Sequence, residues 1–200
     1  SDLLTRWGSA AGLAAIPPTV TRALGEAWRL GADAPVTAVL GFAGSPDPEI
    51  RWRATYSVGR LKAQAAADVL LAATEDSVAL IRATAVRELT VAYADSTRLD
   101  RGALSSRVRR LVADSNPYVR LSALRALATY GTQELASTVI PRLADPDLNV
   151  RVQALTALGQ LRGPQAAETL ADYVEEGPYA LRRQALLSLA RASASAALQR

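Results

Sequence analysis

The stretch "VRLSALRALATYG", residues 119–131, is followed by the similar stretch "VRVQALTALGQLRG", which begins at Val150. In the first copy, apolar or small residues stand at Val119, Ala123 and Leu127, with Tyr130 three positions further on. This spacing places the four side chains along one side of a helix. A phrase that recurs at an interval of about 20 to 50 residues is typical of repeat proteins. The sequence therefore predicts a stack of similar helical units.

The same phrase, an apolar residue followed by Arg-x-x-Ala, recurs along most of the chain. Its arginines are Arg51, Arg82, Arg120, Arg151 and Arg182. The intervals between them are equal except for the one from Arg82 to Arg120, which is longer, and we assign its additional residues to an insertion at 93–102. A degenerate copy without the arginine precedes the others, as expected of a capping repeat. We therefore predict one domain over 1–200, with a cap at 1–44 and five repeats over 45–200.

Each phrase is preceded by residues that favour a turn and the start of a helix. An acid stands six positions before four of the arginines, at Asp76, Asp114, Asp145 and Glu176, whereas the first copy has Ser45. Aspartate and serine commonly cap helices or order turns. A shorter apolar run precedes each of these residues. Each unit is therefore predicted to fold as helix A, a turn and helix B.

The composition supports a helical chain and excludes several kinds of site. Half of the residues are hydrophobic, only 5% are aromatic, and the core must be built from alanine, leucine and valine. Cysteine and histidine are both absent, which removes thiolate nucleophiles, disulfides and the commonest metal ligand. We therefore expect no catalytic residues, no metal site and no cofactor. No small-molecule substrate is evident.

The charge and the ends of the sequence give expectations about its context. The net charge is +4, and Lys62 is the only lysine among 23 basic residues. Abundant arginine and alanine favour a GC-rich bacterial source, and the lack of methionine favours a segment of a larger protein. The apolar stretches are shorter than the roughly 20 residues of a membrane span, so we expect no membrane partner. The compartment stays open between bacterial cytoplasm and periplasm.

The repeated motif also resembles a known family. The stretch "DPDLNVRVQALTALG", residues 145–159, is similar to short bacterial HEAT-like repeats, including those of phycobilin lyases, and the resemblance covers about residues 35–192. It implies an all-α, right-handed α-solenoid of about five to six helix pairs. It also implies a structural ladder of acids and arginines between successive repeats. Mapped onto this chain, the ladder pairs are Asp76/Arg82, Asp114/Arg120, Asp145/Arg151 and Glu176/Arg182, whereas Arg51 is preceded only by Ser45.

A second resemblance is narrower. The phrases "IRWRATYSVGRLK" and "VRVQALTALGQL" are similar to HEAT arrays that are fused to cyclophilin-type peptidyl-prolyl isomerase domains in some bacterial proteins. No cyclophilin sequence lies within these 200 residues. The resemblance implies an accessory array of an isomerase whose catalytic domain would lie outside this segment.

One face of helix B is the candidate binding surface. Positions two before, one after and five after the arginine share a face that is separate from the core stripe, and their residue types differ in every copy. In HEAT-like arrays the B helices line the concave surface. The candidate partner-binding residues are Trp52, Tyr56, Arg87, Tyr118, Leu121, Arg125 and Arg183. The alternative is that the rings pack between repeats.

These observations predict a non-catalytic scaffold that binds a protein or peptide on the concave face of its B helices. Nucleic-acid binding is an alternative, because regularly spaced concave arginines could follow a phosphate backbone. The basic run "RVRRL", residues 107–111, is interpreted as a solvated outer helix face. The accessory array of an isomerase is the other alternative.

Overall fold

The computed structural model of the protein describes residues 18–161 and 163–197, and within these ranges the regular elements are all helical. The chain divides into two compact units, Ser1–Asp100 and Arg101–Arg200, and each is described by itself. Residues 1–17 of the predicted cap lie outside the described residues. The single domain over 1–200 stays a prediction.

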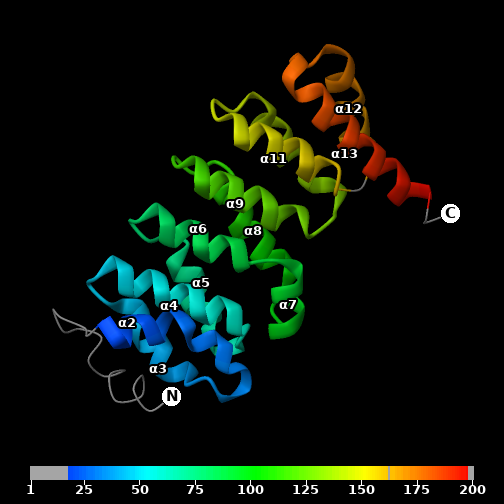
Figure 1. The fold of residues 1–200 in the computed structure, drawn as a ribbon. Coiled ribbons are helices and arrows are strands. Elements are labelled where there is room, and N and C mark those ends of the chain that lie inside the picture. Colours follow the sequence, from blue (N-terminus) through cyan, green and yellow to red (C-terminus); the bar gives the residue numbers. More distant parts are fainter. Residues whose placement is uncertain (1–17, 162, 198–200) are drawn as a thin grey trace. The chain divides into compact units, whose positions relative to one another are not determined.

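The first unit is built around α4, which lies between two other B helices (Figure 1). Its B helices are α2 (Pro18–Glu26), which continues into the 3₁₀ segment η2 (Ala27–Asp33), α4 (Pro48–Leu61) and α6 (Ala79–Glu88). The shorter A segments are α3 (Val36–Gly41) with η3 (Phe42–Gly44), and η4 (Gln64–Ala66) with α5 (Ala67–Ala73). Because α4 contacts both the neighbouring B helices and the A segments, its apolar side is enclosed within this unit.

The second unit repeats the arrangement, with α11 between α9 and α13 (Figure 1). Its B helices are α9 (Pro117–Ala128), α11 (Leu148–Leu158) and α13 (Tyr179–Ala197). Its A segments are α8 (Arg101–Leu111), then η5 (Gln133–Leu135), α10 (Ala136–Val139) and η6 (Ile140–Ala144), and finally α12 (Pro164–Glu176). Pro141 explains why the middle A segment continues as a 3₁₀ helix, because proline cannot donate the next helical hydrogen bond.

The predicted core stripe is buried in both units. The residues at the apolar-Arg-x-x-Ala positions are at most 3% exposed in every repeat, namely Ile50, Ala54, Ile81, Ala85, Val119, Ala123, Val150, Ala154, Leu181 and Ala185. Tyr130 is the exception, because it is half-exposed. The reason is that α9 ends at Ala128, so Tyr130 no longer follows the helical face that carries the stripe.

The region predicted as an insertion is partly helical. Helix α7 occupies Val91–Thr97, and α8 begins at Arg101. The Tyr93 ring is buried, and its hydroxyl has no hydrogen-bond partner among the described residues. Burial, together with the charge of Glu88, raises the pKa of Tyr93 to about 12. Tyr93 is therefore a neutral, structural residue at ordinary pH.

At the start of the B helices, two different residues cap the helix and order the turn before it, whereas the sequence pattern indicated one residue for both roles. The residue four positions before the arginine is the N-cap: Asp47, Asn116 and Asp147 accept hydrogen bonds from the amide two residues further on. The residue six positions before the arginine orders the turn instead. At Ser45, Asp76, Asp114 and Asp145, a side-chain oxygen accepts a bond from the amide two residues on, at 2.8 to 3.2 Å.

Candidate functional site: an arginine ladder and an aromatic surface on the B helices

Two arginines of the repeated phrase link successive B-helix turns through paired hydrogen bonds. In the first unit, Arg51 donates from Nε and Nη2 to the carboxylate of Asp76 at 2.8 and 3.1 Å. In the second unit, Arg120 donates in the same way to Asp145 at 2.8 and 2.6 Å. Both acceptors lie 25 residues after the arginine, in the next repeat. This bidentate geometry is the strongest form of an arginine–carboxylate pair.

The carboxylate partners differ from those mapped in the sequence. Three of the arginines do approach the residue six positions before them, but the bond found there runs from Nη1 to the backbone carbonyl. The acceptors are the carbonyl of Ser45 for Arg51, of Asp76 for Arg82 and of Asp114 for Arg120, at 2.8 to 3.0 Å. Arg51–Asp76 and Arg120–Asp145 thus link successive repeats, as the family resemblance implied. The bidentate bonds of these two aspartates come from the arginine of the preceding repeat, however, and not from Arg82 and Arg151, to which the sequence had mapped them. Arg51 has a full partner in Asp76 even though Ser45 is not an acid.

The ladder aspartates are held in the ionised form. Hydrogen bonds from Arg51, assisted by the Val78 amide, outweigh desolvation and lower the pKa of Asp76. The same bond raises the pKa of Arg51. Burial opposes the ionisation of Asp145, whose side chain is 1% exposed, but bonds from Arg120 and the Asp147 amide lower its pKa overall. Each pair is therefore ionic at neutral pH and serves the fold.

The ladder changes character at the last two arginines. The Nε of Arg151 is buried and has no hydrogen-bond partner among the described residues. Glu176, which follows Arg151 as Asp145 follows Arg120, is exposed. Arg182 is exposed as well, and its Nε donates to the carbonyl of Gly177 at 2.8 Å. The structure therefore does not bring Glu176 into an ion pair with either arginine.

Three aromatic rings form a row on the B-helix face of the first unit. Trp52 and Tyr56 lie on successive turns of α4 with ring centroids 6.4 Å apart, and Trp28 of η2 meets Tyr56 edge-on at the same distance. All three rings are half-buried. The indole nitrogen of Trp52 donates to the Thr84 hydroxyl on α6 at 3.1 Å, which fixes the ring. The row thus has a fixed geometry and remains partly open to solvent.

Four arginine side chains stack on these rings. Arg60 and Arg29 lie over Trp28 with the guanidinium carbon 4.7 and 5.3 Å from the ring centroid. Arg53 lies 5.5 Å from Trp52, and Arg87 lies 5.9 Å from Tyr56. These are cation–π distances. We call the seven residues the aromatic–arginine patch: Trp28, Arg29, Trp52, Arg53, Tyr56, Arg60 and Arg87.

The predicted binding residues fall into two groups. Trp52, Tyr56 and Arg87 come together in the patch. In the second unit, Tyr118 is 75% exposed at the start of α9, Leu121 is half-buried one turn further on, and Arg125 donates to Gln153 on α11 at 3.0 Å.

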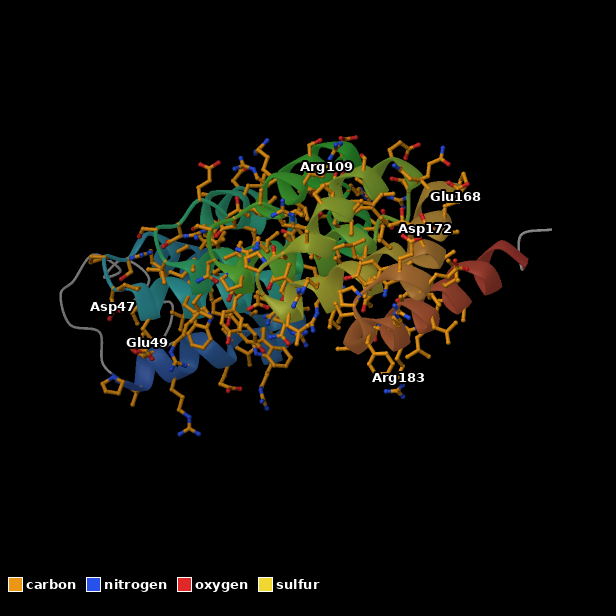
Figure 2. The ribbon with its side chains drawn as sticks, turned by 90° about the horizontal axis from the view of Figure 1, so that it is seen from above. Asp47, Glu49, Arg109, Glu168, Asp172 and Arg183 are labelled. Atoms are coloured by element: carbon orange, nitrogen blue, oxygen red, sulfur yellow. The ribbon has the colours of Figure 1, made fainter. Side chains whose placement is uncertain are left out.

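The remaining predicted residue, Arg183, lies on α13, which α11 separates from α9. In this unit it points to the opposite side from Glu168 and Asp172 of α12 (Figure 2).

Four residues belong to the patch but were not predicted, namely Trp28, Arg29, Arg53 and Arg60. Arg60 lies one further turn along the stripe of Trp52 and Tyr56, so extending that stripe by four positions would have found it. Arg53 stands next to Trp52 and reaches the ring by folding back over it. Trp28 belongs to the degenerate first copy, where the absence of the phrase arginine hides the register.

Other parts of the described chain offer less for chemistry. An open hollow of about 370 Å³ is lined by Ser106, Arg109, Arg110 and Thr138, and one of about 280 Å³ adjoins Asp76. No group of three or more potential metal ligands occurs among the described residues. None of the described helices is long and apolar enough to span a membrane. The B-helix surfaces therefore remain the principal candidate site.

Comparisons with known proteins place the chain in a family. Similar solved structures include an engineered protein from the Northeast Structural Genomics Consortium, at 15% identity, 97% coverage of each chain and a TM-score of 0.60, which supports the fold. Human deoxyhypusine hydroxylase in complex with glycerol matches at 14% identity, with 96% of each chain covered and a TM-score of 0.37. No curated protein matches the sequence. The family model for HEAT repeats matches residues 5–90 and 104–190. Together with the helix pairs, this match confirms the predicted all-α solenoid class, and the chain belongs to the HEAT-repeat family.

Proposed function

We propose that the chain is a non-catalytic scaffold that binds a protein or peptide through the exposed face of its B helices. The aromatic–arginine patch is the observation that carries this proposal. Tryptophan, tyrosine and arginine are the residue types enriched at binding hot spots. The rings are held in place by helix packing and by the bond from Trp52 to Thr84, so little conformational freedom is lost on binding.

The contrast between constant and variable positions supports the same proposal. Arg51 and Arg120 occupy the same position in different repeats and perform the same structural task. The next position changes from Trp52 in α4 to Val152 in α11 and Arg183 in α13. Since the repeated fold accommodates all three types, this position is available for recognition. We assign Tyr118, Leu121, Arg125 and Arg183 as the corresponding contacts of the second unit.

Nucleic-acid binding has less support in the patch. Three of its arginines are each paired with a glutamate: Arg29 with Glu26, Arg53 with Glu49 and Arg87 with Glu88. These carboxylates offset the positive charge that a phosphate backbone requires. If nucleic acid were nevertheless the partner, binding would weaken steeply with added salt, whereas binding to an aromatic surface would show weak salt dependence.

An isomerase role would require a catalytic domain outside this segment. Prolyl-isomerase assays of the 200-residue chain are therefore expected to show no activity. Activity in this chain alone would contradict the proposed non-catalytic role.

The test is selection of short peptides from a displayed random library against the immobilised chain. Selected peptides are then titrated against the native chain and against the double variant Trp52→Ala/Tyr56→Ala by fluorescence anisotropy. The double variant should bind at least about tenfold more weakly, as expected for loss of aromatic hot-spot residues. The matched control is Tyr173→Ala, which removes an equally half-buried ring on the A helix α12, outside the patch, and should bind normally.

Thermal unfolding of the same variants separates recognition from packing. Little change in Tm is expected for the double variant, because its rings are only half-buried. The proposal is overturned if no peptide is selected, or if the selected peptides bind the double variant as tightly as the native chain. A large drop in Tm would instead assign Trp52 and Tyr56 to packing between repeats.

A further inference from the structure

The charges of the aromatic–arginine patch are unevenly compensated. Arg29, Arg53 and Arg87 each have a glutamate within ion-pair distance. Arg60 lies on the same surface, is exposed, and has no carboxylate within ion-pair distance among the described residues. The patch therefore contains one guanidinium whose charge no neighbouring glutamate offsets.

Arg60 is also positioned to receive a ligand group. It stands in the last turn of α4, with its guanidinium 4.7 Å from the Trp28 ring centroid. Stacking uses the flat face of a guanidinium and leaves the N–H donors at its edge available for a bidentate bond to a carboxylate. The ring thus orients the cation before any partner arrives, which lowers the entropic cost of binding.

The surroundings of Arg60 define what should accompany that carboxylate. Trp28 contacts Tyr56, and Tyr56 contacts Trp52, so an apolar surface leads away from the arginine along η2 and α4. Glu26, Glu49 and Glu88 lie beside the other arginines of the patch. Their negative charge disfavours a ligand with many anionic groups and leaves Arg60 as the site for one.

We propose that the patch recognises a peptide segment in which one acidic side chain lies next to large apolar side chains, with Arg60 binding the carboxylate. This inference rests on the proposed function and specifies its ligand. The aromatic row supplies apolar contact area, and Arg60 supplies the selectivity for the acid. The expected partner is therefore a weakly acidic, apolar segment of another protein.

The experiment compares two labelled synthetic peptides with the same flanks, one centred on Leu-Glu-Phe and the other on Leu-Gln-Phe. Native chain should prefer the glutamate peptide by about tenfold, the size expected for a hydrogen-bonded charged group. In Arg60→Gln the preference should disappear, while the affinity for the glutamine peptide stays unchanged. The control Arg191→Gln removes an exposed arginine of α13 and should keep the full preference.

The outcomes separate this inference from the proposed function. If both peptides bind equally and lose affinity in Trp52→Ala/Tyr56→Ala, the binding surface stands and the acidic specificity is overturned. If library peptides also fail to bind, the proposed function fails with it. Tighter binding of a peptide with several glutamates, or of oligothymidylate, with a steep dependence on salt would assign the patch to polyanions and overturn the inference. Circular dichroism of each variant verifies folding.

Discussion

Two neighbouring junctions in the second unit hold the same kind of helices together by different means. Between α9 and α11, Arg120 forms a bidentate pair with Asp145, and Ala128 is buried near the end of α9. Between α11 and α13, the equivalent Arg151 leaves its Nε without a partner among the described residues.

Gly159 stands where α9 has Ala128, and a Cβ there would lie 2.7 Å from the Ser188 carbonyl oxygen. The α9–α11 junction thus relies on the Arg120–Asp145 ion pair, which we call the clamp. The α11–α13 junction relies on close approach of the two helix backbones. The comparison teaches that a repeated sequence phrase does not ensure a repeated interaction.

Breaking the clamp should have the largest effect. Arg120→Met removes the bidentate partner of an aspartate whose side chain is 1% exposed and leaves it only the more distant Arg142, at 3.8 Å. Loss of one member of a buried pair costs about 3–5 kcal/mol, and because Arg142 remains we expect the lower end of this range. The midpoint of urea unfolding should fall accordingly. It is followed by far-UV circular dichroism, because all three tryptophans lie in residues 1–100 and do not report on the second unit. A change near zero would show that the clamp contributes nothing to stability.

Adding a methyl group at the close approach should have the next largest effect. Gly159→Ala forces the backbone of α13 away from α11, and overpacking of this kind costs about 1–3 kcal/mol. Gly25→Ala is the matched control. The added Cβ there meets only the end of the flexible Arg53 side chain, so the unfolding midpoint should change little. Equal effects of the two substitutions would contradict the tight packing of α11 on α13.

Acidification should weaken the clamp while sparing the other junction. Because the folded-state pKa of Asp145 is lowered, its contribution to stability is present above the ordinary aspartate pKa of about 3.9 and is lost as the pH falls through the folded value. Native chain should therefore lose more stability below about pH 4 than Asp145→Asn does. Urea midpoints measured from neutral to strongly acidic pH test this, and parallel curves for the two proteins would exclude an ionic clamp.

The smallest effect is expected at the unpaired arginine. Arg151→Met replaces a buried, unsatisfied Nε by an apolar chain, so stability should stay within about 1 kcal/mol of the native value or rise slightly. Urea unfolding beside Arg120→Met gives the direct comparison. A loss as large as that of Arg120→Met would mean that Arg151 has a partner equivalent to Asp145.

Much of this fold was predictable because it is periodic. The stripe from Val119 to Leu127 and the constant interval between most copies of the phrase were sufficient for the helix pairs and the HEAT-like class. The partner of each arginine was not predictable in this way. The resemblance implied a ladder between repeats, but each acid was mapped to the arginine six positions after it. The carboxylates that bind Arg51 and Arg120 instead lie 25 residues ahead and come within reach only when repeats stack.

The candidate site shows the same limit. Helical spacing within α4 predicted Trp52 and Tyr56 but was not extended by the one further turn that contains Arg60. Trp28 reaches the patch from η2 through packing against α4, in a copy whose register the sequence obscures. Contacts within a helix follow from spacing, but contacts between helices depend on the distance and angle at which they pack.

The 25-residue reach of the ladder also constrains how this chain can change in length. Removing one residue between Arg120 and Asp145 would rotate the downstream part of the chain by about 100° relative to the upstream part wherever the deletion falls in a helix. The carboxylate would then leave the guanidinium. Gain or loss of a whole repeat instead places the equivalent residue of another repeat, at the position of Asp145, opposite each arginine. Length variants of this array are therefore expected to differ by entire repeats, with single-residue changes confined to segments that no rung spans.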